Sequence, residues 1–243
     1  MVADGNRRGE SYGRAAVGMA TAGRGYDMRM TSLHERRDEV APRSMDFGDL
    51  CIDFDARILE PRPWTTAQST WAAELLRSAP PGPVLELCAG AGHIGLLAIH
   101  LEPRPLVCVD VEPVACDYTR SNAERAGLGD LVEVREGSMD AVLEPDERFA
   151  LVIADPPWVP RDETAHFPED PVPAIDGGVD GLDPARSCWA LADRHLLEGG
   201  TAVLQVGTVA QVECLDAEMR GVTRLRVGEV RSFERGVLVA LEA

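Results

Sequence analysis

Hydrophobic and polar positions begin to follow a regular pattern near residue 46. Leu50, Ile52 and Phe54 alternate with Cys and Asp residues, and this period of two predicts a strand with one buried face. We expect Arg57–Leu59 to pair back with this strand as the second arm of a short hairpin.

A helix is predicted next, over Ala67–Ser78. Trp71 begins an apolar stripe with helical spacing, and Thr65 and Thr66 belong to the residue types that cap a helix N-terminus. The prolines and the glycine of residues 80–83 then end this helix.

Beyond residue 83, short apolar runs alternate with longer segments of helical period. The predicted strands are Val84–Cys88, Leu106–Val111, Leu131–Arg135, Ala150–Ala154, Thr201–Val206, Thr223–Val230 and Val237–Leu241. The predicted helices are His93–Leu101, Pro113–Ala126, Asp183–Leu196 and Val209–Met219. Apolar strands that alternate with helices are typical of a mostly parallel sheet covered on both faces. The sequence therefore predicts an α/β fold with a Rossmann-like, doubly wound sheet.

Residues 1–45 differ from the rest of the chain. They are rich in Gly and Arg and show no sustained apolar period, so they cannot bury enough surface to offset the entropy of ordering. We expect a flexible leader over residues 1–45, with at most a short helix over Thr31–Val40, and one folded domain over residues 46–243.

Charge and cysteine usage narrow the possible partners. The 243 residues include 41 acidic and 24 basic side chains, giving a net charge of −17. This charge repels phosphate backbones, so it favours a protein or a small molecule over a nucleic acid. The six cysteines stand singly, which argues against a metal site or disulfide scaffold and favours a cytoplasmic protein with reduced thiols. No apolar run is long enough to span a membrane.

The first strand after residue 83 runs into a glycine turn that suits a nucleotide-type cofactor. Gly90 and Gly92 allow a sharp turn close to a ligand, and Asp110 ends the next strand, where a carboxylate can accept ribose hydroxyls. With Gly95 this spacing also fits a dinucleotide site, so a nicotinamide-dependent oxidoreductase is an alternative. Glu86, inside the strand, favours a cationic cofactor over a pyrophosphate.

The sequence Asp155-Pro156-Pro157-Trp158 follows a buried strand, at the sheet edge where α/β proteins bind ligands. The two prolines stiffen the backbone and leave carbonyl oxygens free to accept hydrogen bonds, while Trp158 offers a flat surface. Together the Asp155 carboxylate and the Pro156 carbonyl can hold both hydrogens of a planar NH2 group. Such a nitrogen is a weak nucleophile because its lone pair is delocalised. A carboxylate of pKa near 3.9 is a weak base, so we expect Asp155 to receive the proton only after group transfer.

These two motifs resemble those of class I S-adenosylmethionine-dependent methyltransferases, whose glycine loop begins with an acid and whose [Asn/Asp/Ser]-Pro-Pro-aromatic motif binds planar nitrogens. The resemblance implies a seven-stranded class I methyltransferase fold and S-adenosyl-L-methionine as cofactor. The cofactor residues it implies are Thr65, Glu86, Cys88, Gly90, Gly92, Asp110, Val111, Ser138, Met139 and Asp155. The catalytic residues it implies are Asp155, Pro156, Pro157 and Trp158.

A narrower resemblance, over residues 50–215, is to the bacterial release-factor glutamine N5-methyltransferases. It rests on residues 60–65, on the loop 167–182 after the Pro-Pro motif and on the segment 199–211. It implies that Val159–Leu182 forms part of the substrate pocket. Two departures concern the substrate. Asp155 replaces the family's Asn, which makes the motif similar to that of adenine N6-methyltransferases, and residues 1–45 are too short and polar for the family's N-terminal helical bundle.

The resemblance thus implies an enzyme that methylates a planar nitrogen. The acceptor expected first is a protein glutamine side chain, and the exocyclic amine of a nucleic-acid base or a small metabolite is the alternative. A nicotinamide-dependent oxidoreductase and an inactive cofactor-binding protein are weaker alternatives.

Overall fold

The computed structural model describes residues 41–243 and begins with a two-stranded hairpin. Strand β1 (Arg43–Phe47) pairs antiparallel with β2 (Leu50–Phe54). The expected pairing of Arg57–Leu59 with β2 is wrong, because these residues leave the hairpin as a turn and β1 takes the place beside β2. The expected helix Thr31–Val40 and residues 1–40 of the expected leader lie outside the described residues; β1 begins ahead of the expected boundary at residue 46.

The main sheet has seven strands in the order β5-β4-β3-β6-β7-β9-β8. Its strands are β3 (Val84–Leu87), β4 (Leu106–Asp110), β5 (Val132–Glu136), β6 (Phe149–Ala154), β7 (Leu196–Val206), β8 (Arg226–Ser232) and β9 (Val237–Glu242). The first five run parallel to one another, and β9 enters antiparallel between β7 and β8. The order reverses at β3, where the chain first goes outward to β4 and β5 and then returns to β6 on the other side. A doubly wound sheet binds its ligands at such a reversal.

Seven α-helices and three short 3-10 helices connect the strands of the described region. The α-helices are α1 (Thr66–Leu76), α2 (His93–Leu101), α3 (Pro113–Arg125), α4 (Met139–Val142), α5 (Val172–Ile175), α6 (Asp183–His195) and α7 (Val209–Met219). The 3-10 helices are η1 (Pro63–Thr65), η2 (Gly129–Leu131) and η3 (Arg161–His166). None of the helices in this region has the length and apolarity needed to cross a membrane.

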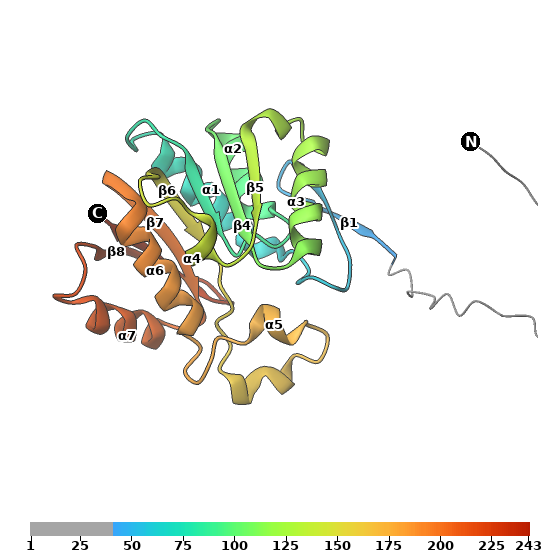
Figure 1. Ribbon diagram of the computed structural model, residues 1–243. Helices are drawn as coiled ribbons and strands as arrows, with labels where there is room; N and C mark the ends of the chain where they lie inside the picture. The colour runs from blue at the N-terminus through green and yellow to red at the C-terminus, as the bar shows by residue number, and fades with distance from the viewer. Residues whose placement is uncertain (1–40) are drawn as a thin grey trace, which may run out of the picture. The chain divides into compact units, whose positions relative to one another are not determined.

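Two hydrophobic cores lie on opposite faces of the sheet. On one face α1, α2, α3 and the β1–β2 hairpin cover Leu151 and Ile153 of β6. On the other face α6 and α7 cover Val152 and Ala154 of the same strand (Figure 1). Successive strand residues point to opposite faces, which explains why β6 is apolar at every position. The helices η3 and α5 project beyond the carboxyl ends of the strands (Figure 1).

The start of α1 differs from the sequence-based expectation. The hydroxyls of Thr65 and Thr66 do not cap the helix; they donate to the carbonyls of Arg62 and Pro63, 2.8 Å away in each case. The reason is that η1 precedes α1, so the first α-helical N–H groups already have backbone partners within a continuous helical turn.

Candidate active site

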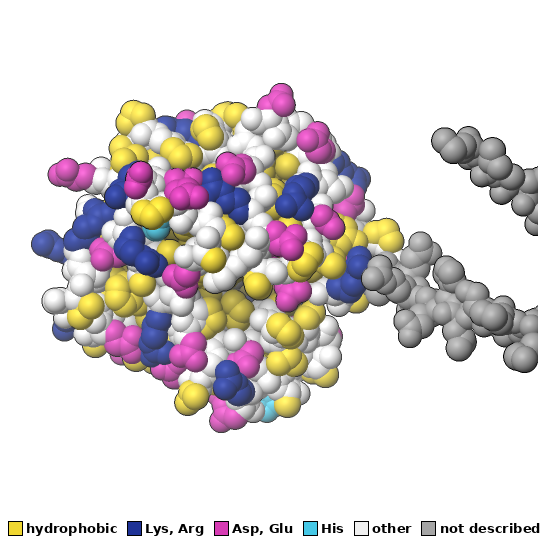
Figure 2. All heavy atoms as spheres, in the orientation of Figure 1, with side chains coloured by type: hydrophobic (Ala, Val, Ile, Leu, Met, Phe, Trp, Pro, Cys, Tyr) yellow, Lys and Arg dark blue, Asp and Glu magenta, His cyan; other side chains and the backbone are white. Residues whose placement is uncertain are grey.

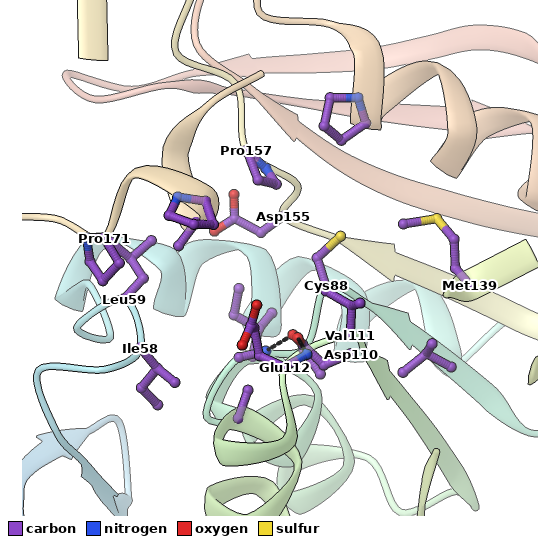
Figure 3. Close-up of a pocket in the computed structure, with 18 of the residues that line it drawn as sticks. Ile58, Leu59, Cys88, Asp110, Val111, Glu112, Met139, Asp155, Pro157 and Pro171 are labelled. Atoms are coloured by element: carbon purple, nitrogen blue, oxygen red, sulfur yellow. Dashed lines mark hydrogen bonds between the residues drawn. The ribbon is translucent and has the colours of Figure 1, made fainter. Parts of the chain in front are cut away.

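A cavity of about 640 Å³ opens at the carboxyl ends of β3, β4 and β6. Figure 2 shows this region as a hollow above the projecting α5 segment, with hydrophobic side chains on its floor. In Figure 3 Leu59 and Pro171 lie on one side of the view and Cys88 on the other, with Asp155 and Pro157 between them.

The glycine turn forms one wall of the cavity. Gly92 has φ of +75° and precedes α2 directly, a conformation that side chains other than that of glycine rarely adopt. The carboxylate of Asp110 accepts from the Gly90 N–H at 2.8 Å and from the Glu112 N–H at 2.9 Å. Asp110 lines the cavity, and its carboxylate oxygens have four lone pairs, so it can also accept hydroxyls of a ligand.

Glu86 lies beneath the turn and does not line the cavity. Its carboxyl accepts from the Gly95 N–H at 2.9 Å and from the Cys108 thiol at 3.3 Å. Burial raises the pKa of Glu86 to about 7. We infer that this side chain supports the shape and charge of the turn from below, since the α2 backbone stands between it and the cavity.

Cys88 is the one described residue other than glycine with positive φ, at +57°. Its thiol lines the cavity and lies against Cys188 of α6. This hydrogen-bonding contact, together with burial, raises the pKa of the Cys88 thiol well above its usual value. Cys88 is thus a protonated, unreactive wall residue held in a backbone conformation that glycine adopts more easily.

The segment after β5 forms the wall beside Cys88. Ser138, Met139 and Asp140 all line the cavity, and Met139 also packs on the core formed by α6. The carboxylate of Asp140 accepts from Arg194 at 3.0 Å on the exposed side. The uncharged Ser138 lies two residues before Asp140. Either side chain can accept a hydrogen bond from the adenine amine of the cofactor.

Strand β6 places Asp155 at the floor of the cavity. The backbone just before it is fixed by α1, because the Gln68 amide donates to the carbonyls of Ala154 and Val203 at 3.0 Å each. Burial alone raises the pKa of Asp155 to about 7. The sequence-based assumption of an ordinary pKa near 3.9 is therefore wrong, and Asp155 is a better proton acceptor than expected.

Trp158 does not line the cavity, although Pro157 does. The Trp158 ring lies against Gly207, where a Cβ would approach Trp158 Cε3 to 2.5 Å. Its carbonyl accepts from the side chain of Gln211 at 3.1 Å. Trp158 thus fastens the loop after β6 to the start of α7, and the stacking role expected for its ring stays a prediction.

Two segments far apart in the sequence close the mouth of the cavity. Arg62, just before η1, forms an ion pair of 2.5 Å with Asp170 in the loop after η3. Arg57 also lines the cavity, and Asp55, to which it donates, is fully buried and has its pKa lowered to about 2 mainly by this bond. The OH of Tyr118 on α3 donates to the same carboxylate.

Most of the predicted site residues meet at this cavity. Its lining includes Thr65, Cys88, Gly90, Asp110, Val111, Ser138, Met139, Asp155 and Pro157, but not Glu86, Gly92, Pro156 or Trp158. Arg57 and Ser187 also line it, and sequence reasoning missed both. Pro173 and Asp176 line it too; they lie in the loop Val159–Leu182 that the resemblance implied for the substrate pocket, but the sequence did not indicate which side chains of this loop turn inward.

Comparison with known proteins supports the methyltransferase interpretation of this cavity. Residues 68–168 match the methyltransferase small domain family. The chain is 32% identical to the release factor glutamine methyltransferase of Gloeobacter violaceus over 205 residues, which are 79% of this chain and 71% of that protein. It is 35% identical over 129 residues to the ribosomal protein uL3 glutamine methyltransferase of Bradyrhizobium diazoefficiens, covering 51% of this chain and 40% of that one.

The fold is also found in solved structures. The human Mettl16 catalytic domain, in complex with an RNA hairpin, superimposes with a TM-score of 0.65 at 17% identity, covering 82% of this chain and 75% of that one. The ribosomal protein L11 methylase of Lactobacillus delbrueckii has a TM-score of 0.58 at 15% identity, over 77% and 82% of the two chains.

The seven-stranded sheet and its glycine-walled cavity define a class I S-adenosylmethionine-dependent methyltransferase. This class excludes the nicotinamide-dependent oxidoreductase that the glycine spacing had left open. Within the class, the chain belongs to the release factor glutamine methyltransferase family.

The cavity fits S-adenosylmethionine. The glycine turn offers room for close backbone approach, Asp110 offers acceptors for ribose hydroxyls, and Val111 and Met139 offer apolar contacts for a flat ring. When bound, the cofactor supplies an electrophilic methyl group. The unpaired carboxylates along the wall favour its positive charge.

Proposed function

We propose that this enzyme transfers a methyl group to the side-chain nitrogen of a protein glutamine. The single observation that carries the proposal is the membership of the release factor glutamine methyltransferase family, with the motif Asp155-Pro156-Pro157-Trp158 beside the cofactor cavity. Relatives named for release factors and for ribosomal protein uL3 suggest a protein of the translation machinery as substrate. We propose a cytoplasmic location, in agreement with six free thiols.

The chemistry of the amide assigns a role to each group. Asp155 and the carbonyl of Pro156 accept one amide hydrogen each, which returns electron density to the nitrogen and fixes its direction. The amide is neutral, so it needs no base before it attacks. After transfer the N-methylated nitrogen is strongly acidic, and Asp155 receives its proton. Positioning provides most of the acceleration, up to about 7–11 kcal/mol in principle.

The exocyclic amine of a nucleic-acid base is the second candidate. An aspartate in the Pro-Pro motif can accept from an aryl amine as readily as from an amide. The net charge of −17 opposes this substrate, since phosphates are repelled by a surface of that sign.

The test uses purified enzyme, labelled cofactor and three acceptors: an unmodified bacterial release factor, unmodified uL3 and an adenine-containing RNA. We expect label in a glutamine of one of the two proteins, located by mass spectrometry as the addition of one methylene. Asp155→Ala should abolish this transfer and leave cofactor affinity nearly unchanged. Asp146→Ala, an exposed change in the turn before β6 and outside the cavity lining, is the matched control. Label in RNA alone would refute the proposal.

A further inference from the structure

Within the part of the chain that the structure describes, the carboxyl group of Asp155 has two oxygen atoms without a partner, whereas an amide substrate requires only one acceptor from this residue. Burial is the sole cause of its shifted pKa, so among residues 41–243 no hydrogen bond or cation stabilises the carboxylate. Both oxygens are therefore available to a bound acceptor. Pro157, which lies beside Asp155 in Figure 3, brings no polar side chain that competes for them.

The nature of the acceptor decides whether this carboxyl must act as a base. An amide or an aryl amine is neutral and keeps its hydrogens until transfer, so an asparagine oxygen serves it equally well. An aliphatic amine is protonated at neutral pH and has no lone pair. It must lose a proton before it can attack, and an aspartate can take that proton whereas an asparagine cannot.

The charge of the cavity wall also favours a cationic acceptor. The seven lining carboxylates are those of Glu60, Asp110, Glu112, Asp140, Asp155, Asp176 and Asp183, against the two guanidinium groups of Arg57 and Arg62. Both guanidinium groups are already paired, with Asp55 and Asp170. Four of the carboxylates pair with arginines, as Arg43–Glu60, Arg194–Asp140, Arg161–Asp176 and Arg186–Asp183. No ion pair of this kind engages Asp110, Glu112 or Asp155 within residues 41–243.

Even without Asp155, the two uncompensated carboxylates of Asp110 and Glu112 exceed the single net positive charge of S-adenosylmethionine, which carries a sulfonium, an ammonium and a carboxylate. A second cation can therefore enter the cavity with the cofactor in place. A neutral amide gains nothing from this excess, whereas an ammonium group is attracted by it.

We propose that this site also methylates a primary aliphatic amine, the α-amino group of a polypeptide N-terminus, with Asp155 as the general base. The activity rests on the same cofactor cavity as the proposed glutamine reaction, but it requires a proton acceptor before methyl transfer, whereas in the glutamine reaction the proton leaves only after transfer.

The step balances without a further reactant. The ammonium passes one proton to the Asp155 carboxylate, and the freed lone pair of the nitrogen forms the bond to the methyl carbon. The carbon–sulfur bond breaks and its electrons remain on sulfur. The product is an N-methylammonium group, and the carboxyl returns its proton to water. An α-amino group, with a pKa near 7.7–8.0, is close to Asp155 at about 7, whereas a lysine, near 10.4, is poorly matched.

The experiment compares four synthetic peptides of one sequence with purified enzyme and labelled cofactor. The first has a free N-terminus and neither Gln nor Lys, and the second is its N-acetylated form. The third and fourth are N-acetylated and contain one Gln or one Lys. We expect transfer to the first peptide and none to the second, with the Lys peptide slower than the first.

Asp155→Asn separates the two activities, because it keeps an acceptor oxygen and loses the base. We expect a loss of about 10²–10⁴-fold on the free N-terminus, the usual contribution of a general base. On the Gln peptide we expect a smaller loss, because the asparagine oxygen still accepts the amide hydrogen and water can take the proton that leaves after transfer. Asp146→Asn, an exposed change in the turn before β6 and outside the cavity lining, is the matched control, and calorimetric binding of S-adenosylhomocysteine confirms that each variant is folded. On the free N-terminus the wild-type rate should also fall as pH drops below 7.

Each outcome bears on one claim. Transfer to Gln without transfer to the free N-terminus overturns this inference and leaves the proposed function standing. Transfer to the free N-terminus without transfer to Gln or to the protein acceptors overturns the proposed function and leaves this inference standing. An equal loss of both activities in Asp155→Asn overturns the role of Asp155 as a base, and transfer to neither peptide overturns both.

Discussion

Replacing Asp155 by Asn should stabilise the free enzyme at alkaline pH, even though it alters the reaction centre. In the folded protein burial raises the pKa of Asp155 to about 7, from 3.8 for an unburied group. Between these two values the unfolded chain is ionised and the folded protein is protonated. The folded state then binds more protons, so the free energy of unfolding falls as pH rises through this window. The asparagine side chain of the variant does not titrate, so the variant escapes this loss of stability.

The magnitude follows from the shift of about three pH units, at about 1.4 kcal/mol per unit. This gives an upper bound of about 4 kcal/mol for the stability that the wild type loses between pH 4 and pH 8. Asp155 is only partly buried at the cavity floor, and cavity water reduces the penalty. We therefore expect Asp155→Asn to be about 2–4 kcal/mol more stable than wild type at pH 8, and nearly equal to it at pH 4.

Urea unfolding of the cofactor-free enzyme at several pH values, at constant ionic strength, measures this difference. Glu86 has a similarly raised pKa, caused mainly by burial, and the charge of Asp155 is the smallest of its causes. Because Glu86 is present in both proteins, most of its effect cancels in the comparison. Asp146→Asn, an exposed change in the turn before β6, is the matched control for the loss of one carboxylate. A gap between wild type and Asp155→Asn that stays constant from pH 5 to pH 8 would refute the reasoning.

Other residues give further tests. Asn122, fully buried, exchanges two hydrogen bonds with the Asp53 backbone and donates to the Ala91 carbonyl; Asn122→Ala should cost about 3 kcal/mol in urea unfolding, against almost nothing for exposed Ser121→Ala, and a loss below about 1 kcal/mol would contradict it. Arg62→Ala breaks the partly buried pair with Asp170 and should raise KM for the acceptor about fivefold at unchanged kcat; Asp170→Asn should match it, and additive effects in the double variant would argue against a shared clasp. Cys88→Gly removes the strain of positive φ, so it should raise the free energy of unfolding by about 1 kcal/mol and, with it, Tm. Cofactor binding in calorimetry should not weaken, and a lower Tm would show that the thiol contact outweighs the strain.

The strands and helices of the main sheet could be predicted because each segment carries its own hydrophobic period and its own start and stop signals. Helices α2 and α7 have the predicted bounds, since each follows a clear signal, a glycine turn or the capping Thr208. The hairpin could not be predicted in the same way. Strand β1 is mostly exposed and lies in a polar stretch, so its pairing with β2 depends on packing rather than on its own pattern.

The site was predictable as a set of positions and less so as a set of orientations. Asp110 and Asp155 stand at strand ends, and parallel strands bring these ends together. Glu86 lies on the neighbouring strand β3 and Trp158 follows β6, but their side chains turn away, toward Gly95 and Gly207. The raised pKa of Asp155 depends on burial by distant segments, which no local pattern reveals.

The two hydrogen bonds from Gln68 have a consequence for substrate recognition. They join α1 to the ends of β6 and β7, one residue before Asp155, where parallel strands would otherwise begin to diverge. The pocket loop of residues 159–182 can therefore differ in sequence and shape while the aspartate keeps its place. Recognition and alignment are mechanically separated, so relatives of this enzyme can change their partners by remodelling the loop and leave the reacting geometry untouched.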